Sequence, residues 1–255
     1  MKIENGKRND AAFNEVERVK TGKRSAFNFQ LLAFHLVLLL AFPLLGFAQS
    51  GRSTDMGAIL GAKYQSPSMG KFVIGVEEEL RFDHNCSRFD RWLNEVEVEY
   101  PCLHNRMRLG LAGGAIRRYN DKGYYENRAR VGLDVTYAET VRRFKLSVRS
   151  RVMATFRDER IANYRVNPKL YWRNRFQVAY QIPNSRFKYE LSTELHWLLN
   201  DPKARVIDNL RTVMTVNYRL TRRQSLSAFL RMDNDLQVKK PVDRFYLGLT
   251  YHYKS

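Results

Sequence analysis

The chain of 255 residues is poor in cysteine, proline and acidic residues, with 2 Cys, 7 Pro and 26 Asp and Glu against 44 Lys and Arg. Two cysteines cannot build a disulfide-rich scaffold or a zinc site made of four cysteines. The mean hydropathy of −0.50 excludes a bundle of membrane helices, which needs several apolar stretches of roughly 20 residues. The formal net charge of +18 makes nucleic acid the first partner to consider.

The chain has one long apolar run, residues 31–48, which follows a basic leader and ends in Gly46-Phe47-Ala48. Small residues at the third and first positions before a cleavage site are typical of secretory signal peptides. We therefore predict that residues 1–48 are a signal peptide cleaved after Ala48. The alternative is a retained membrane helix, but 18 residues interrupted by His35 and Pro43 are marginal for one. Export removes the argument for nucleic acid, which we do not expect as a partner.

Strict alternation of apolar and polar residues dominates the rest of the chain. In residues 186–199 (RFKYELSTELHWLL), the odd positions are mostly aromatic or aliphatic and the even positions are charged or polar. A period of two puts these sets on opposite faces of a strand. The same pattern predicts ten strands, at 72–82, 92–100, 105–118, 127–138, 143–156, 169–182, 186–199, 210–220, 225–233 and 245–253.

The predicted connections alternate between short and long. The short ones fall at 101–104, 139–140, 183–184 and 221–222, and the long ones at 83–89, 119–124, 157–167, 200–206 and 236–243. Bacterial outer-membrane barrels have short turns at one end, longer loops at the other and an even strand number. The pattern therefore favours an all-β, antiparallel up-and-down transmembrane β-barrel of about ten strands.

A secreted, soluble β-sandwich that binds a polyanion is the competing interpretation, because its strands also alternate. The predicted strands are longer than the 5–6 residues usual in soluble sheets. Aromatic residues on the apolar faces gather near strand ends, which is typical of the interfacial girdles of a membrane barrel. These girdle residues are Phe72, Trp92, Tyr100, Tyr137, Phe144, Phe156, Tyr180, Phe187, Trp197, Tyr218, Tyr251 and Tyr253.

The polar faces of these strands would then line the lumen. We call the predicted lumenal charges the charge ladder: Glu77, Glu79, Arg81, Glu95, Glu97, Glu99, Arg106, Arg108, Arg128, Arg130, Arg149, Arg151, Arg173, Arg175, Glu194, Arg211 and Arg231. A tight turn at 101–104 would pair Glu99 with Arg106 and Glu97 with Arg108, while Glu194 would face Arg173 or Arg175. Two interpretations remain open, a small pore for anionic solutes and a barrel filled by ion-paired side chains. Ten strands lie near the closed end of the size range, which favours a largely filled interior.

Catalytic candidates are few. His196 and Glu194 share the predicted lumenal face and could do acid–base chemistry, but no nucleophile motif accompanies them. We expect no metal site and no cofactor. Cys86 and Cys102 lie at opposite ends of one strand, too far apart for a disulfide.

Several strand sequences resemble a family of bacterial outer-membrane proteins catalogued as domain of unknown function 2490. These are EEELRF (Glu77–Phe82), RRY (Arg117–Tyr119), NRARVGLDVTY (Asn127–Tyr137), KLSVRSRV and FYLGLTYHY. The resemblance covers roughly residues 55–255. It implies an outer-membrane β-barrel and brings no known activity or site residues.

Family members often begin with an aromatic-led strand before the EEELRF-like one, and Asp55–Gln65 could take that place. Residues 49–70 are therefore an N-terminal periplasmic segment or an extra strand, residues 71–255 form the barrel, and twelve strands are the alternative count.

The sequence thus predicts a barrel in the outer membrane of a Gram-negative bacterium, acting as a small, largely filled channel or as a structural barrel with an arginine-rich lumen. An outer-membrane hydrolase with lumenal or rim His, Glu and Asp residues is the alternative. Expected partners are outer-membrane lipid and lipopolysaccharide, the barrel-assembly machinery during insertion, and small anionic solutes.

Overall fold

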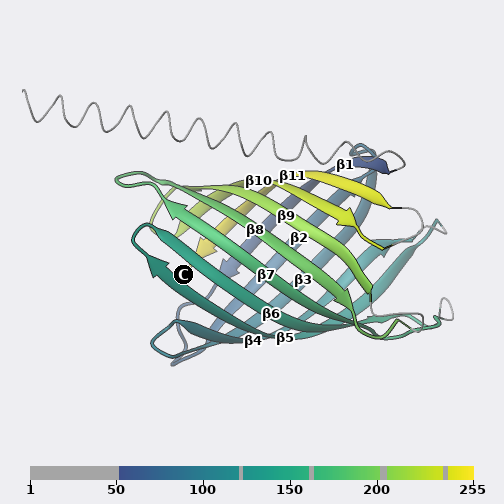
Figure 1. Ribbon diagram of the computed structural model, residues 1–255, viewed down its shortest axis with the longest axis horizontal. Coiled ribbons are helices and arrows are strands. Elements are labelled where there is room, and N and C mark those ends of the chain that lie inside the picture. Colours follow the sequence, from purple (N-terminus) through teal and green to yellow (C-terminus); the bar gives the residue numbers. More distant parts are fainter. Residues whose placement is uncertain (1–51, 121–122, 161–163, 202–205, 238–240) are drawn as a thin grey trace, which may run out of the picture. The chain divides into compact units, whose positions relative to one another are not determined.

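The computed structural model describes residues 52–120, 123–160, 164–201, 206–237 and 241–255, so the predicted signal peptide lies outside the described residues. These residues form a closed barrel of eleven strands (Figure 1). The strands are β1 (Ser53–Gln65), β2 (Val73–Asp83), β3 (Arg88–Cys102), β4 (Met107–Tyr119), β5 (Tyr125–Val141), β6 (Phe144–Arg157), β7 (Lys169–Gln181), β8 (Phe187–Leu198), β9 (Val206–Arg219), β10 (Gln224–Asp235) and β11 (Val242–Lys254). In the described part of the chain, no helix has the length and apolarity to cross a membrane.

The barrel closes through a parallel pair. Each strand is antiparallel to the next along the chain, whereas β1 and β11 run parallel, from Ser53 opposite Val242 to Gln65 opposite Lys254. An odd number of up-and-down strands leaves the first and last strand pointing the same way, so parallel closure follows from the count. Because every strand has two neighbours, the sheet has no open edge. The β-sandwich interpretation is therefore wrong.

The structure corrects the strand count, which is one more than the ten predicted and one fewer than the alternative of twelve. The ten predicted strands correspond to β2 through β11; the prediction omitted β1, so the barrel begins at Ser53 rather than at residue 71. Within β1, the sequence GAILGA (57–62) has small residues on both faces, which weakens the alternation that reveals the other strands. The segment Asp55–Gln65, indicated by the family resemblance, is part of this strand.

The connections are less regular than predicted. At one end, called the short-turn end, lie residues 66–72, 103–106, 142–143, 182–186 and 220–223; the other connections lie at the long-loop end. Residues 84–87 make a turn as short as 103–106 although they lie at the long-loop end. In each turn three consecutive residues have positive φ, 51°, 54° and 64° in the first and 47°, 54° and 65° in the second. Non-glycine residues adopt this conformation rarely, so composition did not reveal the tight turn.

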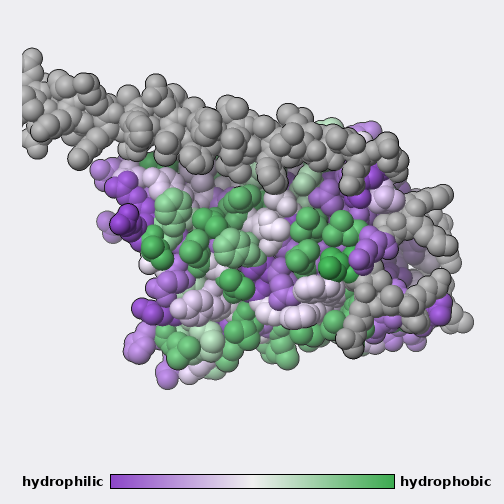
Figure 2. All heavy atoms as spheres, in the orientation of Figure 1, coloured by the Kyte–Doolittle hydropathy of each residue, from purple (hydrophilic) through white to green (hydrophobic). Residues whose placement is uncertain are grey.

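The outer surface of the barrel is apolar and banded. On the face shown in Figure 2, hydrophobic side chains gather mainly over the middle of the wall and hydrophilic ones towards both ends. Near the short-turn end, rings on neighbouring strands meet with centroids 5.4 Å (Phe72–Tyr100), 5.0 Å (Phe144–Tyr180) and 4.9 Å (Phe187–Tyr218) apart. Towards the long-loop end, Trp172 and Trp197 stack at 5.1 Å.

The predicted girdle residues all lie on strands or at strand ends. More than a third of the surface of seven of them is exposed, namely Phe72, Trp92, Tyr137, Phe144, Phe156, Phe187 and Tyr251. The remaining five, Tyr100, Tyr180, Trp197, Tyr218 and Tyr253, are half-buried, each against a neighbouring ring. Two further rings belong to these pairs and were not predicted as girdle residues, Tyr64, stacked on Tyr253, and Trp172, stacked on Trp197.

Candidate functional site

The inward-facing side chains enclose a charged cavity of about 720 Å³. Fifteen basic and nine acidic side chains line it, so its wall carries an excess of positive charge. A second cavity of about 550 Å³ shares Glu97, Arg108 and His252 with the first and extends to Arg219 and Arg223 at the short-turn end. The lumen is therefore partly filled by side chains and retains space along its length.

The charge ladder lies in this lumen with one exception, Arg106. The other sixteen predicted members line the larger cavity: Glu77, Glu79, Arg81, Glu95, Glu97, Glu99, Arg108, Arg128, Arg130, Arg149, Arg151, Arg173, Arg175, Glu194, Arg211 and Arg231. Period-two alternation was sufficient to find them because it is independent of strand pairing.

Arg106 is misplaced because the turn before β4 differs from the predicted one. The turn occupies residues 103–106, and the register places Glu99 opposite Gly110 rather than opposite Arg106. Arg106 is exposed in the turn and approaches Glu139 at 3.5 Å. The predicted pairs Glu99–Arg106 and Glu97–Arg108 are therefore wrong, and Arg108 instead donates to Glu99 over 3.1 Å.

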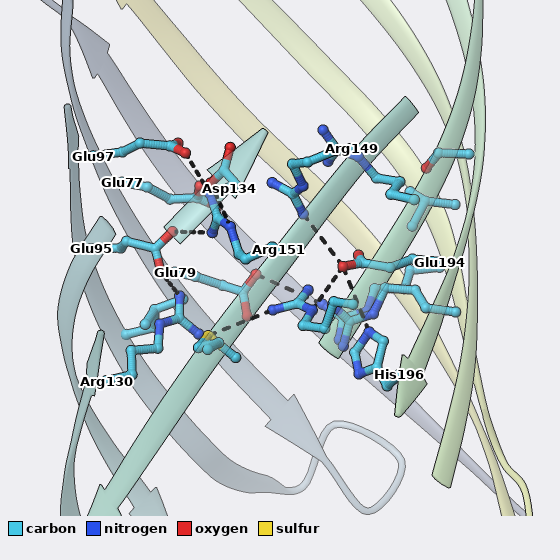
Figure 3. A pocket seen from close by; sticks show the side chains of 18 of the residues that line it. Glu77, Glu79, Glu95, Glu97, Arg130, Asp134, Arg149, Arg151, Glu194 and His196 are labelled. Carbon is cyan, nitrogen blue, oxygen red and sulfur yellow. Dashed lines mark hydrogen bonds and ion pairs between the residues drawn. The ribbon is translucent and has the colours of Figure 1, made fainter. Parts of the chain in front are cut away.

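One group of lumenal charges, the Arg151 cluster, consists of Arg151, Glu95, Glu97 and Asp134 (Figure 3). The Arg151 guanidinium on β6 donates to Asp134 Oδ1 on β5 (2.8 Å), to Glu95 Oε1 on β3 (3.1 Å) and to Glu97 on β3. Arg130 on β5 forms a further ion pair with Glu95. These contacts tie β6 to its neighbour β5 and also to β3, which is not its neighbour. The positive charge of Arg151 is therefore compensated by carboxylates within the cluster.

A second group, the Glu194 cluster, consists of Glu194 on β8 with Arg149 on β6 and with Arg173 and Arg175 on β7. Glu194 Oε1 accepts hydrogen bonds from Arg173 Nε over 2.7 Å and from Arg149 Nη2 over 3.3 Å. Arg175 lies directly opposite Glu194 in the strand register. Two guanidinium groups thus bind one carboxylate and a third lies opposite it in the sheet, and Figure 3 shows Arg149 and His196 directed towards it.

A third group connects β2, β9, β10 and β11, since Arg231 on β10 also lies 3.9 Å from Glu79 on β2. Arg231 donates to Asp233 over 2.6 Å, Arg211 donates to the same carboxylate over 2.8 Å, and Arg81 pairs with Glu79 at 2.5 Å. The guanidinium groups of Arg81 and Arg231 lie over the Tyr246 ring, 5.0 and 5.5 Å from its centroid. Asp134, Asp233 and Tyr246 were not among the predicted site residues, although all three share the inward parity of their strands.

The catalytic candidates do meet, but in an arrangement that serves ion pairing. His196 Nε2 lies 3.8 Å from Glu194 Oε1, the same oxygen that holds Arg149 and Arg173. The carboxylate oxygen nearest His196 is therefore already held by two guanidinium groups, which is the arrangement of a structural ion pair rather than of an acid–base pair.

Two other contacts resemble reactive sites. Ser227 Oγ lies 2.7 Å from His252 Nε2 and also contacts Asn217, so these side chains join β9, β10 and β11. At the long-loop end, Asp55, Asp83 and His84 approach one another with metal-ligand spacing. However, both Asp83 oxygens accept from Arg88 (2.9 and 2.8 Å), and Asp55 accepts from the backbone N–H groups of His84 and Asn85. These contacts hold the β2–β3 turn. Cys86 and Cys102 are both free, as predicted.

The long-loop mouth contains a further buried acid. Glu126 is fully buried and accepts from Arg128 over 2.9 Å and from Asn120 over 3.3 Å. In the β6–β7 connection, Tyr164 packs under the Arg157 guanidinium at 4.8 Å. Burial and the neighbouring Glu126 carboxylate raise the pKa of Tyr164 to about 12, so its hydroxyl stays protonated at neutral pH.

Two solved structures illustrate the proteins that the chain is similar to. A structure titled as the NanC porin has 13% sequence identity and a TM-score of 0.46, with 70% of this chain and 86% of that one covered. An anion-selective porin from Comamonas acidovorans has 15% identity and a TM-score of 0.33, with 73% of this chain and 54% of that one covered. No curated protein matches the sequence.

The family comparison agrees with the resemblance seen in the strand sequences. A family model described as "Protein of unknown function (DUF2490)" matches residues 59–245, a span from β1 to β11 that includes all the lumenal clusters described above. The chain belongs to this family.

Proposed function

We propose that the mature chain is an outer-membrane β-barrel that lets small anions pass, after removal of residues 1–48 as a signal peptide. The observation that carries the proposal is the imbalance of charge in the lumen. Fifteen basic and nine acidic side chains line the larger cavity. In a low-dielectric wall such an imbalance produces a potential that raises the local concentration of anions and excludes cations.

The excess of positive charge in the cavity is proportionally larger among the side chains that have no ion-pair partner. Within the described part of the chain, eight of the nine cavity carboxylates have a basic partner at ion-pair distance, and Asp208 does not. By contrast, no carboxylate among the described residues lies within ion-pair distance of Arg157, Lys169 or Arg175, which line the same cavity. The charges available to a passing solute are therefore mainly positive.

The short-turn end extends this positive surface. Each of its five connections contains Lys or Arg, and none contains Asp or Glu. Arg186, Arg222 and Arg223 from these connections line the smaller cavity. A basic vestibule at the mouth of a basic lumen supports capture of anions from that side.

The outer surface supports the membrane part of the proposal. The apolar band and the paired aromatic rings near both ends match the surface that a lipid bilayer requires of a barrel. On this proposal lipopolysaccharide and outer-membrane lipid surround the wall, and the barrel-assembly machinery inserts it.

Two measurements test the proposal. Membrane fractionation of cells that produce the full chain should recover it in the outer membrane, with a gel mobility that changes on boiling. Vesicles containing the barrel should swell faster in small organic anions than in cations of equal size. A periplasmic protein without a mobility shift would contradict the location, and faster entry of the cations would contradict the selectivity.

A further inference from the structure

We infer that the Glu194 cluster is a binding site for a small oxyanion, a carboxylate or phosphate group, in which Glu194 acts as a resident competitor. The inference rests on the proposed function and deepens it, because it assigns a saturable site to a lumen that otherwise only attracts anions. It begins from the placement of four arginines. On the inward faces of β6 and β7, Arg149 lies directly opposite Arg175, and Arg151 lies directly opposite Arg173.

Like charges directly opposite each other destabilise a sheet unless something compensates them. Arg151 is compensated by three carboxylates from β3 and β5. Arg149, Arg173 and Arg175 have only Glu194 between them, and Arg149 and Arg173 both bind its Oε1 oxygen. The cluster therefore holds three positive charges and one negative charge.

The unused hydrogen-bonding capacity points to a ligand. The Nε atom of Arg149 is buried and has no hydrogen-bond partner, and no carboxylate lies within ion-pair distance of Arg175 in the described residues. A cation without an anionic partner in the barrel interior is unfavourable unless water in the lumen or a bound anion compensates it. The planar fork of a guanidinium matches the paired oxygens of a carboxylate or phosphate.

The surroundings select for a compact anion. The cavity of about 720 Å³ has room for one small molecule. Glu95 and Glu97 in the same lumen are already bound to Arg151, so they do not compete for Arg175. Because Glu194 occupies the place between Arg149 and Arg173, an incoming oxyanion must share these groups with it. Neutralising Glu194 would therefore strengthen anion binding, an effect opposite to that expected if the carboxylate served only to stabilise the barrel.

The test is calorimetric titration of the folded full-length barrel in detergent with inorganic phosphate, against sodium chloride of equal ionic strength. Saturable binding is expected. Arg175→Gln should weaken it about tenfold, because a charged hydrogen-bonded contact is lost. Arg160→Gln is the matched control, since Arg160 is exposed in the β6–β7 connection and pairs with Asp158.

Glu194→Gln should tighten phosphate binding, and this result distinguishes a ligand site from a merely structural cluster. Heat-modifiable gel migration checks that each variant is folded. Loss of binding in Glu194→Gln, or equal affinity in wild type, Arg175→Gln and Arg160→Gln, would overturn the inference. Anion-selective swelling without saturable phosphate binding would overturn this site and leave the proposed function standing. Saturable phosphate binding without selective swelling would contradict the proposed function and leave the binding site standing.

Discussion

At the residue scale, Arg151 stands out because its guanidinium group forms ion pairs with three carboxylates. Only 3% of its surface is exposed, and it holds carboxylates of Glu95, Glu97 and Asp134. Such a group differs from a surface ion pair, because removal of Arg151 leaves the buried Asp134 and the half-buried Glu97 without their cationic partner, whereas Glu95 keeps Arg130. The stability of the barrel should therefore depend on Arg151 far more than on any arginine in a turn.

Replacement of Arg151 by Met keeps much of the length of the side chain and removes the charge. We expect it to lower the free energy of unfolding by about 3–5 kcal/mol, the usual cost of breaking a buried ion pair. Arg106→Met is the control, since Arg106 is 62% exposed in its pair with Glu139, and it should cost less than about 1 kcal/mol. Urea unfolding of both variants in lipid vesicles measures the difference, and equal losses would contradict this account of the cluster.

A second residue-scale prediction concerns Gly248, on the inner face of β11. A Cβ atom at this position would overlap Cζ and Cε2 of the Phe229 ring. The Phe229 ring thus occupies the space that a side chain at residue 248 would need. Gly248→Ala should destabilise the barrel by about 1–3 kcal/mol through overpacking.

A double-mutant cycle of Gly248→Ala and Phe229→Ala tests this explanation. Adding Phe229→Ala to Gly248→Ala removes the obstructing ring, so its cost should be smaller than the cost of Phe229→Ala alone. Strictly additive losses in urea unfolding would show that the two residues do not interact in this way.

The residue scale also shows what the sequence could reveal about the site. Inward parity identified Glu77, Arg151 and Glu194 without knowledge of the fold. It identified their partners only in part, because partners depend on register, and register depends on turn length. Glu194 does lie opposite Arg175 and bind Arg173, as predicted, whereas the partners predicted for Glu97 and Glu99 were wrong. Because the turn lies at 103–106, with its consecutive positive-φ residues, Arg106 lies outside the lumen and Arg108 is the residue that donates to Glu99.

At the element scale, β1 is the strand that alternation missed and the one on which closure depends. Its parallel register with β11 is specific, with Met56 beside Phe245 and Leu60 beside Leu249. Glycine and alanine on β1 reduce the contrast between its faces, whereas the charged inner faces of β2 through β11 made those strands evident. Ten of eleven strands could therefore be predicted from periodicity, and the eleventh only from a family resemblance.

Cysteine cross-linking tests the parallel seam. With Cys86 and Cys102 replaced by Ser, the pairs Met56→Cys/Phe245→Cys and Leu60→Cys/Leu249→Cys should each form a disulfide, because register partners bring their Cα atoms within the required distance. The mismatched pair Met56→Cys/Leu249→Cys should not, since four residues of strand separate the two positions by roughly 13 Å. Cross-linking of the mismatched pair alone would contradict the register of β1.

At the scale of the whole molecule, the barrel has an apolar outside and a charged inside, the reverse of a soluble protein. Leu133, at the middle of β5, is 64% exposed on the outer wall, and Leu103, in a turn at the short-turn end, is 61% exposed. If lipid covers the wall, these two leucines with nearly equal exposure have different surroundings. Their substitution therefore separates a membrane barrel from a barrel in water.

Leu133→Arg should lower the free energy of unfolding in vesicles by about 2–4 kcal/mol, the cost of a cation at the bilayer midplane, and Leu103→Arg by about 0–1 kcal/mol. Chemical unfolding of both variants measures the difference, and Leu103→Arg is the control because it introduces the same charge at a position of nearly equal exposure. Equal effects of the two substitutions would argue against lipid contact at Leu133.

The central claim is that the arginine-rich lumen selects anions, and the reversal potential of single barrels in a planar bilayer tests it most directly. Under a potassium chloride gradient, the reversal potential of the wild-type barrel should have the sign of the chloride equilibrium potential. The double charge reversal Arg149→Glu/Arg175→Glu should move the reversal potential towards that of potassium, because it replaces two positive charges of the Glu194 cluster by negative ones. A wild-type barrel that prefers potassium, or a preference that the double substitution leaves unchanged, would contradict the account.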